Sequence, residues 1–277
     1  MKGITVILVL LAASFAFAWS VGCGDDDDDD DNDDGGDDDV SDDDDDATDD
    51  DGDDDDGDDD DDAADDDDDD DDDGDCPDPT VDISVCDPSN GPFSLTIDNE
   101  FYPLEVGMHL VLESEDERVE IDVLDETEEV AGVTTRVVTE TEYEDDELSE
   151  VSWNWFAQAP DGTVCYFGEE VDNYEGGVLV GHHGEWRAGD DGALPGIIMP
   201  ADAAVGQAYF QEYYEGEAED MGKHTAMGES ISTPAGDFDD TLSVRDYNPL
   251  EGCGGEPKTY VSGIGIVQDE DLFLTEY

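Results

Sequence analysis

Apolar and polar residues alternate along much of the second half of the chain, with a period of two rather than 3.6. In residues 118–124, Val119, Ile121 and Val123 share one face of an extended chain, and the acidic residues between them share the other. This alternation is typical of a β-strand that is buried on one side.

Residues 151–157 alternate in the same way. Apolar residues occupy the odd positions, while Ser152, Asn154 and Phe156 occupy the even ones, so the two sets lie on opposite faces of a strand. Further stretches rich in β-branched or aromatic residues lie at 134–143, 178–180, 242–247, 259–261 and 264–274.

Dipeptides that favour tight turns separate these stretches: Asp161-Gly162, Gly176-Gly177, Asp191-Gly192 and Gly254-Gly255. The pattern leaves room for one short helix, around residues 200–205, and for no long amphipathic helix. It predicts an all-β domain of about ten antiparallel strands in meander order, forming a sandwich or a curved, partly open barrel.

The first residues have the features of an export signal. Lys2 gives a positive start, and residues 4–18 are apolar except for two hydroxyl residues. This length suits a signal peptide better than a membrane-spanning helix, which needs about 20 residues. Ala16-Phe17-Ala18 is one candidate cleavage site, whereas Ser20-Val21-Gly22-Cys23 resembles a lipobox. We expect a signal peptide over residues 1–22 and lipid attachment at Cys23.

The number of cysteines agrees with a lipid anchor. The chain has five, and an exported protein is expected to pair its thiols. If Cys23 carries lipid, Cys76, Cys86, Cys165 and Cys253 remain, and they allow three connectivities. Spacing does not choose among these, and we take Cys76–Cys86 and Cys165–Cys253 as the working expectation.

Residues 25–75 are dominated by aspartate, with 39 Asp in this segment. Such a segment has almost nothing apolar to bury, and its carboxylates repel one another, so residues 23–75 are expected to form a disordered acidic tether. We expect loose, exchangeable binding of divalent cations, since Asp69 to Gly74 begins like a calcium loop but has Thr80 where the twelfth-position Glu is needed. Its charge argues against nucleic-acid binding.

Residues 76–277 are long enough for one folded domain. They contain 6 Lys and Arg against 48 Asp and Glu, a formal charge of −42. The charge predicts a solvated acidic shell, or alternatively a face that docks a cationic partner.

Several short motifs in this domain occur together. They are Phe101-Tyr102-Pro103-Leu104, Trp155-Phe156-Ala157-Gln158, Tyr166-Phe167-Gly168-Glu169, Trp186, Pro195-Gly196-Ile197, Gln211-Glu212-Tyr213-Tyr214, Pro234-Ala235-Gly236 and Tyr260 to Val267. In this combination the domain resembles a family of uncharacterised bacterial exported proteins and lipoproteins. The resemblance implies export to the cell envelope and a β-rich domain. It implies no activity and no catalytic residues. Cys165 stands where the resemblance would place an aromatic residue.

Candidates for chemistry are few. His182-His183-Gly184-Glu185 is the best metal motif, but on a strand only His183 and Glu185 share a face, and a catalytic zinc needs three converging ligands. No nucleophile elbow, zinc-protease motif or phosphate-binding loop is present. We therefore expect no metal, no cofactor and no enzymatic activity.

The aromatic residues can be interpreted in two ways. They form cross-strand core pairs, or they line a cavity for a hydrophobic ligand. They are Trp153, Trp155, Phe156, Tyr166, Phe167, Trp186, Phe210, Tyr213 and Tyr214. The apolar run at residues 194–200 belongs either under the sheet or at the rim of such a pocket.

The resulting hypothesis is a lipid-anchored protein of the cell envelope that displays a non-enzymatic binding or structural module on a long acidic tether. The alternative is a carrier or sensor of a hydrophobic ligand in a half-open β-barrel. The membrane is the expected partner, through the lipid, and the sequence names no protein partner. Gly24, rather than Asp, follows Cys23, which favours the outer membrane or cell surface over the inner membrane.

Overall fold

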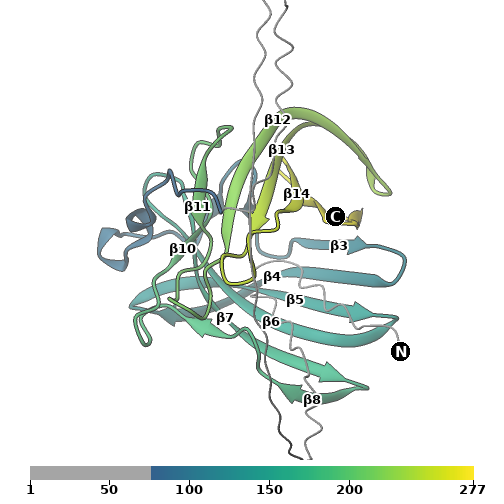
Figure 1. Ribbon diagram of the computed structural model, residues 1–277, viewed down its shortest axis with the longest axis horizontal. Coiled ribbons are helices and arrows are strands. Elements are labelled where there is room, and N and C mark those ends of the chain that lie inside the picture. The colour runs from purple at the N-terminus through teal and green to yellow at the C-terminus, as the bar shows by residue number, and fades with distance from the viewer. Residues whose placement is uncertain (1–75) are drawn as a thin grey trace, which may run out of the picture. The chain divides into compact units, whose positions relative to one another are not determined.

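The computed structural model describes residues 76–277, and their fold is all-β with two short 3-10 helices (Figure 1). The helices are η1 (Ile83–Cys86) and η2 (Pro88–Asn90). The first eight strands are β1 (Ile97–Asp98), β2 (Pro103–Leu104), β3 (His109–Glu113), β4 (Glu117–Val130), β5 (Val133–Glu144), β6 (Glu147–Gln158), β7 (Val164–Glu175) and β8 (Val178–Gly181). The last eight are β9 (Trp186–Arg187), β10 (Gly196–Met199), β11 (Ala208–Phe210), β12 (Met221–Thr233), β13 (Gly236–Tyr247), β14 (Glu256–Val261), β15 (Gly265–Asp269) and β16 (Leu272–Glu276).

The expected signal peptide, Cys23 and the poly-Asp tether lie in residues 1–75, outside the described residues. Within residues 76–277, no helix combines the length and the apolar character that a membrane crossing requires.

Fourteen strands form one antiparallel sheet, and β1 pairs only with β2. The sheet runs in the order β10-β7-β6-β5-β4-β3-β16-β15-β14-β13-β12-β11, with β8 and β9 also paired to β7. Most neighbours in the sheet are consecutive in the chain, and the main exception is the place where the last strand, β16, lies beside β3. The all-β antiparallel meander predicted from the alternation is thus confirmed.

The sheet is rolled but not closed. Its two end strands, β10 and β11, approach each other where the Leu194 N–H donates to the Tyr213 carbonyl O at 2.8 Å. Gly196 lies against the backbone of Gln211 at this seam, and any Cβ at position 196 would overlap the Gln211 carbonyl O. Glycine is therefore required for the two ends to come together.

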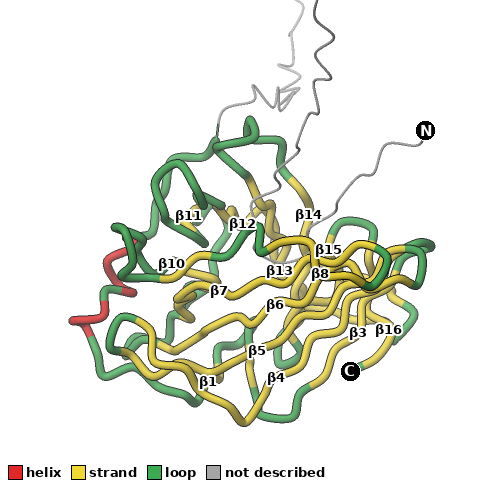
Figure 2. The backbone as a smooth tube through the Cα atoms, turned by 90° about the horizontal axis from the view of Figure 1, so that it is seen from below, coloured by secondary structure: helices red, strands yellow, loops and turns green. Residues whose placement is uncertain are grey.

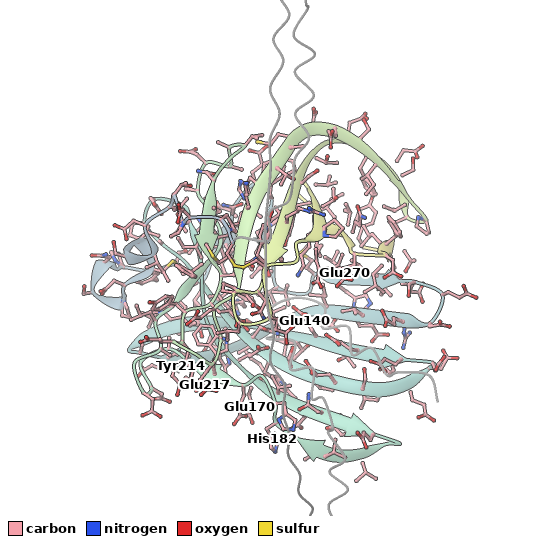
Figure 3. The ribbon with its side chains drawn as sticks, viewed as in Figure 1. Glu140, Glu170, His182, Tyr214, Glu217 and Glu270 are labelled. Carbon is pink, nitrogen blue, oxygen red and sulfur yellow. A yellow bond between two sulfur atoms is a disulfide. The ribbon has the colours of Figure 1, made fainter. Side chains whose placement is uncertain are left out.

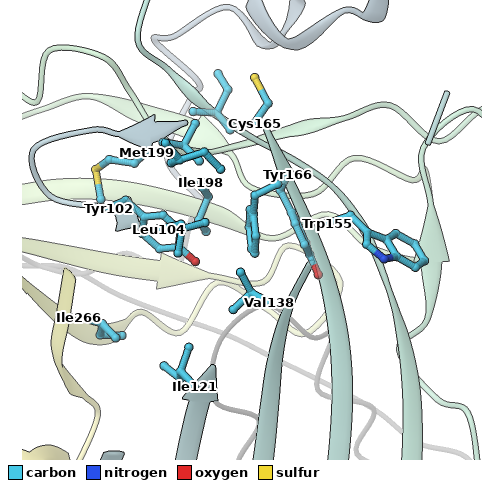
Figure 4. Packing of buried hydrophobic residues seen from close by; sticks show 14 of the residues in the cluster. Tyr102, Leu104, Ile121, Val138, Trp155, Cys165, Tyr166, Ile198, Met199 and Ile266 are labelled. Carbon is cyan, nitrogen blue, oxygen red and sulfur yellow. The ribbon is translucent and has the colours of Figure 1, made fainter. Parts of the chain in front are cut away.

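The core lies between two parts of the rolled sheet. In Figure 1, β4 to β8 fan out as one layer while β12 and β13 arch over it, and Figure 2 shows β7, β6, β5, β4 and β3 side by side. Val119, Ile121 and Val123 of β4 are all buried, as their alternation predicts. The buried aromatic residues include Phe156 and Tyr166, stacked with ring centroids 4.9 Å apart, and Figure 4 shows Tyr166 among the core residues.

The polar face of β6 also points inward. Ser152 and Asn154 are buried, while Val151 and Trp153 are only half-buried. Tyr166 OH donates to Asn154 Oδ1 at 2.7 Å, and Asn154 Nδ2 donates to Ser152 Oγ at 2.8 Å. Alternation alone does not say which face of a strand is inside, and here hydrogen bonds between inward side chains compensate the polar face.

Other local expectations are corrected. Residues 200–205 form bends and a turn rather than a helix, and the helical turns lie instead at η1 and η2. The run 264–274 is two strands, β15 and β16, joined by a turn. The apolar run 194–200 contains the fully buried strand β10, so it lies within the sheet.

Four cysteines form two disulfides, but the expected connectivity is wrong. The bonds are Cys76–Cys253 and Cys86–Cys165, with Cα–Cα distances of 5.0 and 5.6 Å. A bond between Cys76 and Cys86 is prevented because η1 carries Cys86 into the core against β7. Disulfides form and persist in oxidising compartments, so the domain is extracellular or periplasmic.

Candidate functional site

A small pocket opens inside the roll, between the segment that leads into β3, strand β4 and the turn before β15. We call it the Glu140 pocket. Its lining residues are Tyr102, Pro103, Leu104, Met108, Leu110, Ile121, Val123, Glu140, Ile264, Gly265 and Ile266. Figure 4 shows Tyr102, Leu104, Ile121 and Ile266 within one region of the core. The pocket is partly open, and its free volume is about 20 Å³, enough for a group of roughly the size of one water molecule.

Glu140 is the only acidic residue that lines this pocket. It lies on β5, opposite Ile121 of β4 and Ser152 of β6, and it is 2% exposed. Burial raises the pKa of its carboxyl well above the usual range, Asp269 and Glu150 raise it further, and Lys258 opposes them. Figure 3 shows Glu140 near the middle of the domain. Burial therefore favours the protonated form of Glu140, in a pocket whose other lining residues are apolar or glycine apart from Tyr102.

A buried ion pair lies close to Glu140. Lys258 of β14 lies opposite Asp269 of β15, and its Nζ is 2.9 Å from Asp246 Oδ2 and 3.3 Å from Asp269 Oδ2. Burial alone would lower the pKa of Lys258, but the two carboxylates outweigh it and keep the ammonium charged. Burial raises the pKa of Asp269 to about 6, and Lys258 counteracts part of that rise.

A second group of acids lies beside the seam between β10 and β11. Glu212 is fully buried, and neither of its carboxyl oxygens has a hydrogen-bond partner among residues 76–277. Its main-chain N–H donates to the Asp220 carbonyl O at 3.3 Å, which brings the two acids together. Burial, and then the charge of Asp220, raise the pKa of Glu212. The pKa of Asp220 is about 7 because it is buried near Asp246.

Glu169 extends this group toward β7. It pairs in register with Trp186 of β9, and the indole N–H of Trp186 faces Glu212 without hydrogen-bonding geometry. Burial, and then Glu212, raise the pKa of Glu169 well above the usual range.

Glu142 and Glu150 form a third acidic pair, directly opposite each other on β5 and β6. Asn173 Nδ2 donates to Glu150 Oε2 at 2.7 Å. Burial raises the pKa of Glu150 to about 7, and burial and then Glu150 raise that of Glu142. Two like charges this close favour a state in which at least one carboxyl keeps its proton.

The motifs that carry the resemblance converge on these places. Tyr102 to Leu104 and Ile264 to Ile266 line opposite parts of the Glu140 pocket, although the two motifs are far apart in the sequence. Tyr166 packs edge-on against Trp186, with ring centroids 5.2 Å apart, and pairs in register with Gly196.

The histidines, by contrast, do not converge. His182 Nδ1 is 2.8 Å from the Val171 carbonyl O and 3.0 Å from Asp172 Oδ1, close to β8. His109 pairs with Asp122 on β3 and β4, and His224 on β12 lies 3.0 Å from the Tyr209 hydroxyl. In the part of the chain that the structure describes, no three metal-binding side chains are arranged to hold an ion.

Sequence reasoning missed the interior acids because it assigned the acidic residues to a solvated shell. One signal is positional: Glu140 and Glu142 alternate with Thr139 and Thr141 between β-branched residues, so the two pairs lie on opposite faces of the strand. Lys258, one of only six basic residues in the domain, was the other available signal.

Comparison of the chain with family models, with curated proteins and with solved structures finds no match. The resemblance to exported lipoproteins therefore rests on the motifs alone.

Proposed function

We propose that this protein is an exported binding module, held at a membrane by lipid on Cys23, and that the Glu140 pocket is its ligand site. The observation that carries the proposal is a buried carboxyl, Glu140, that lines an otherwise apolar pocket. Apolar pockets with a few polar groups and a perturbed acid are the usual form of a small-molecule site.

The chemistry of the pocket favours a small amine with an apolar body. The free volume is close to the size of an ammonium group, and the apolar lining residues, such as Leu104, Met108 and Ile264, suit an alkyl group. Carboxyl groups outnumber amines around the pocket, since those of Glu140, Glu150, Asp246 and Asp269 accompany the one ammonium of Lys258. A bound cation would stabilise the ionised form of Glu140.

Export and anchoring support the same proposal. Two disulfides fit an oxidising compartment, and the lipobox-like sequence at Cys23 and the poly-Asp segment fit a tethered lipoprotein of the outer membrane or cell surface. A tether of this kind lets one domain sample the space around its anchor.

Titration of the full chain with n-butylammonium tests the ligand site. We expect methyl NMR signals of Leu104 and Ile266 to shift on titration, and Glu140→Gln to weaken the apparent affinity by about tenfold or more. Glu126→Gln makes the same substitution on an exposed part of β4, at a residue that does not line the pocket, and should leave the affinity unchanged. Equal affinities for the two variants would contradict the proposal.

A carrier or sensor of a hydrophobic ligand is the second candidate, because all lining residues other than Glu140 and Tyr102 are apolar or glycine. It requires the pocket to widen, since about 20 Å³ does not admit an acyl chain. Titration with n-butanol separates the two candidates. Shifts as large with butanol as with butylammonium, unaffected by Glu140→Gln, would favour the hydrophobic carrier over the amine site.

A further inference from the structure

Strand β8 is an edge strand with unusual side chains. It pairs with β7 through Val178, Leu179 and Gly181, and no other strand among the described residues covers its outer side. A strand with a single neighbour leaves alternate N–H and C=O groups free for pairing with another chain. Figure 1 shows β8 at the far end of the β4–β8 layer.

The side chains of β8 are apolar and exposed. Val178, Leu179 and Val180 are 63%, 46% and 51% exposed. Edge strands in soluble proteins are normally protected by charged residues or proline, and β8 has neither in its Val-Leu-Val-Gly sequence. Three consecutive exposed aliphatic residues are unusual in a domain of formal charge −42, and they indicate a surface that another molecule covers.

The charge around β8 determines what kind of partner fits. Residues 137–186, which include β6, β7 and β8, contain thirteen Asp and Glu and no Lys or Arg. Glu170, Glu175 and Glu185 are exposed close to β8 in the chain, and Figure 3 shows Glu170 and His182 at this end of the molecule. A second copy of the domain, or an anionic lipid surface, would bring like charge against this layer.

We infer that the free edge of β8 receives an extended peptide segment of a partner protein, one in which basic residues alternate with apolar ones. The segment adds a strand to the sheet through main-chain hydrogen bonds, which is an established mode of peptide recognition. One of its apolar side chains covers Leu179. On the opposite face, the aliphatic stems of its lysines or arginines lie over Val178, and their charged ends reach Glu175, which pairs with Val178. This surface is separate from the Glu140 pocket, and the inference does not depend on the proposed ligand.

Binding of a synthetic peptide that alternates Lys with Val to the full chain tests this inference. The expected result is slower amide hydrogen exchange at Val178 to Gly181, and binding that weakens about tenfold or more in Leu179→Asp. Val205→Asp is the matched control, because Val205 is 59% exposed but lies in a turn outside the sheet edge. The Val205 variant should bind like the natural protein.

A second peptide serves as the control: it keeps the positive charge but cannot form the main-chain hydrogen bonds of an added strand. The same Lys-Val peptide, methylated at every backbone nitrogen so that neither of its edges can donate, still neutralises carboxylates anywhere on the chain, the poly-Asp segment included. It cannot add a strand, so we expect no protection of β8. Three results would overturn the inference. The first is equal protection of β8 by both peptides, and the second is equal peptide binding by the Leu179 and Val205 variants. The third is that the protein does not bind the peptide but shows self-association or vesicle binding that depends on Leu179.

Discussion

At the residue scale, the main feature is an imbalance of buried charge. Seven acidic side chains of residues 76–277 are buried, and Lys258 is the one buried lysine in that range. The acids are Glu140, Glu142, Glu150, Glu169, Glu212, Asp220 and Asp269. Ionising them all inside the protein would cost far more than folding provides, so most must hold a proton or gain a cation at neutral pH.

Lys258 is expected to matter more than any other single charge. Lys258→Met leaves the buried Asp269 and the half-buried Asp246 without their counter-ion, and we expect the free energy of unfolding to fall by about 3–5 kcal/mol at pH 8. The loss should be smaller near pH 5, where the abandoned acids can take up protons. Urea unfolding at the two pH values measures both quantities.

Lys223→Met provides the control for that experiment. Lys223 is half-buried on β12, outside the Asp246–Asp269 pair, and its loss should change stability by less than about 0.5 kcal/mol. Similar losses in the two variants would show that Lys258 is an ordinary surface charge.

At the element scale, the seam between β10 and β11 decides whether the sheet can roll. Gly196→Ala places a methyl group against the Gln211 carbonyl, and we expect a loss of about 1–3 kcal/mol of stability. Gly254→Ala is the matched control, because a Cβ there meets no atom within 4 Å. Thermal or urea unfolding of the two variants makes the comparison, and an equal effect of both would mean that the seam is not tightly packed.

The sequence predicts the strands better than it predicts their faces. The four turn dipeptides all fall between strands, and β4 buries the face that its alternation marks. On β6, both faces carry residues of moderate size, so which face is inside depends on Tyr166 and β7, far away in the chain. The same limit applies to the disulfides, because spacing cannot show that η1 turns Cys86 toward Cys165.

The candidate site was beyond prediction for a related reason. Each inward acid looks like an ordinary surface residue in the sequence, and only the rolled sheet brings β3, β4, β5 and β15 around one pocket. The odd number of cysteines and the composition of residues 25–75 can be interpreted without tertiary information. For this reason the sequence says more about where the protein is located than about what it does.

At the scale of the whole molecule, stability should depend on pH in an unusual direction. A carboxyl whose pKa is higher in the folded state than in the unfolded state stabilises the fold below the unfolded pKa, near 4, and loses that contribution as pH rises through the folded pKa. The pKa values of Glu150 and Asp220 are about 7 and that of Asp269 is about 6, because all three are buried.

We therefore expect the free energy of unfolding to decrease between about pH 5 and about pH 8, by about 1.4 kcal/mol per pH unit for each proton held only by the folded state. His224 acts in the opposite direction at lower pH, since burial lowers its pKa to about 4. Urea unfolding across this pH range, at constant salt, measures the slope. Stability that rises toward pH 8 would show that the interior acids are ionised and compensated in the folded state.

The central claim is that this exported domain holds a small amine in the Glu140 pocket. Native mass spectrometry of the protein, gently extracted from its own envelope and compared with its denatured mass, tests it most directly. We expect a non-covalent mass of a nitrogen-containing small molecule that is lost on denaturation, and a lower occupancy in Glu140→Gln than in Glu126→Gln. Identical native and denatured masses, after the two disulfides and the proposed lipid on Cys23 are accounted for, would contradict the claim.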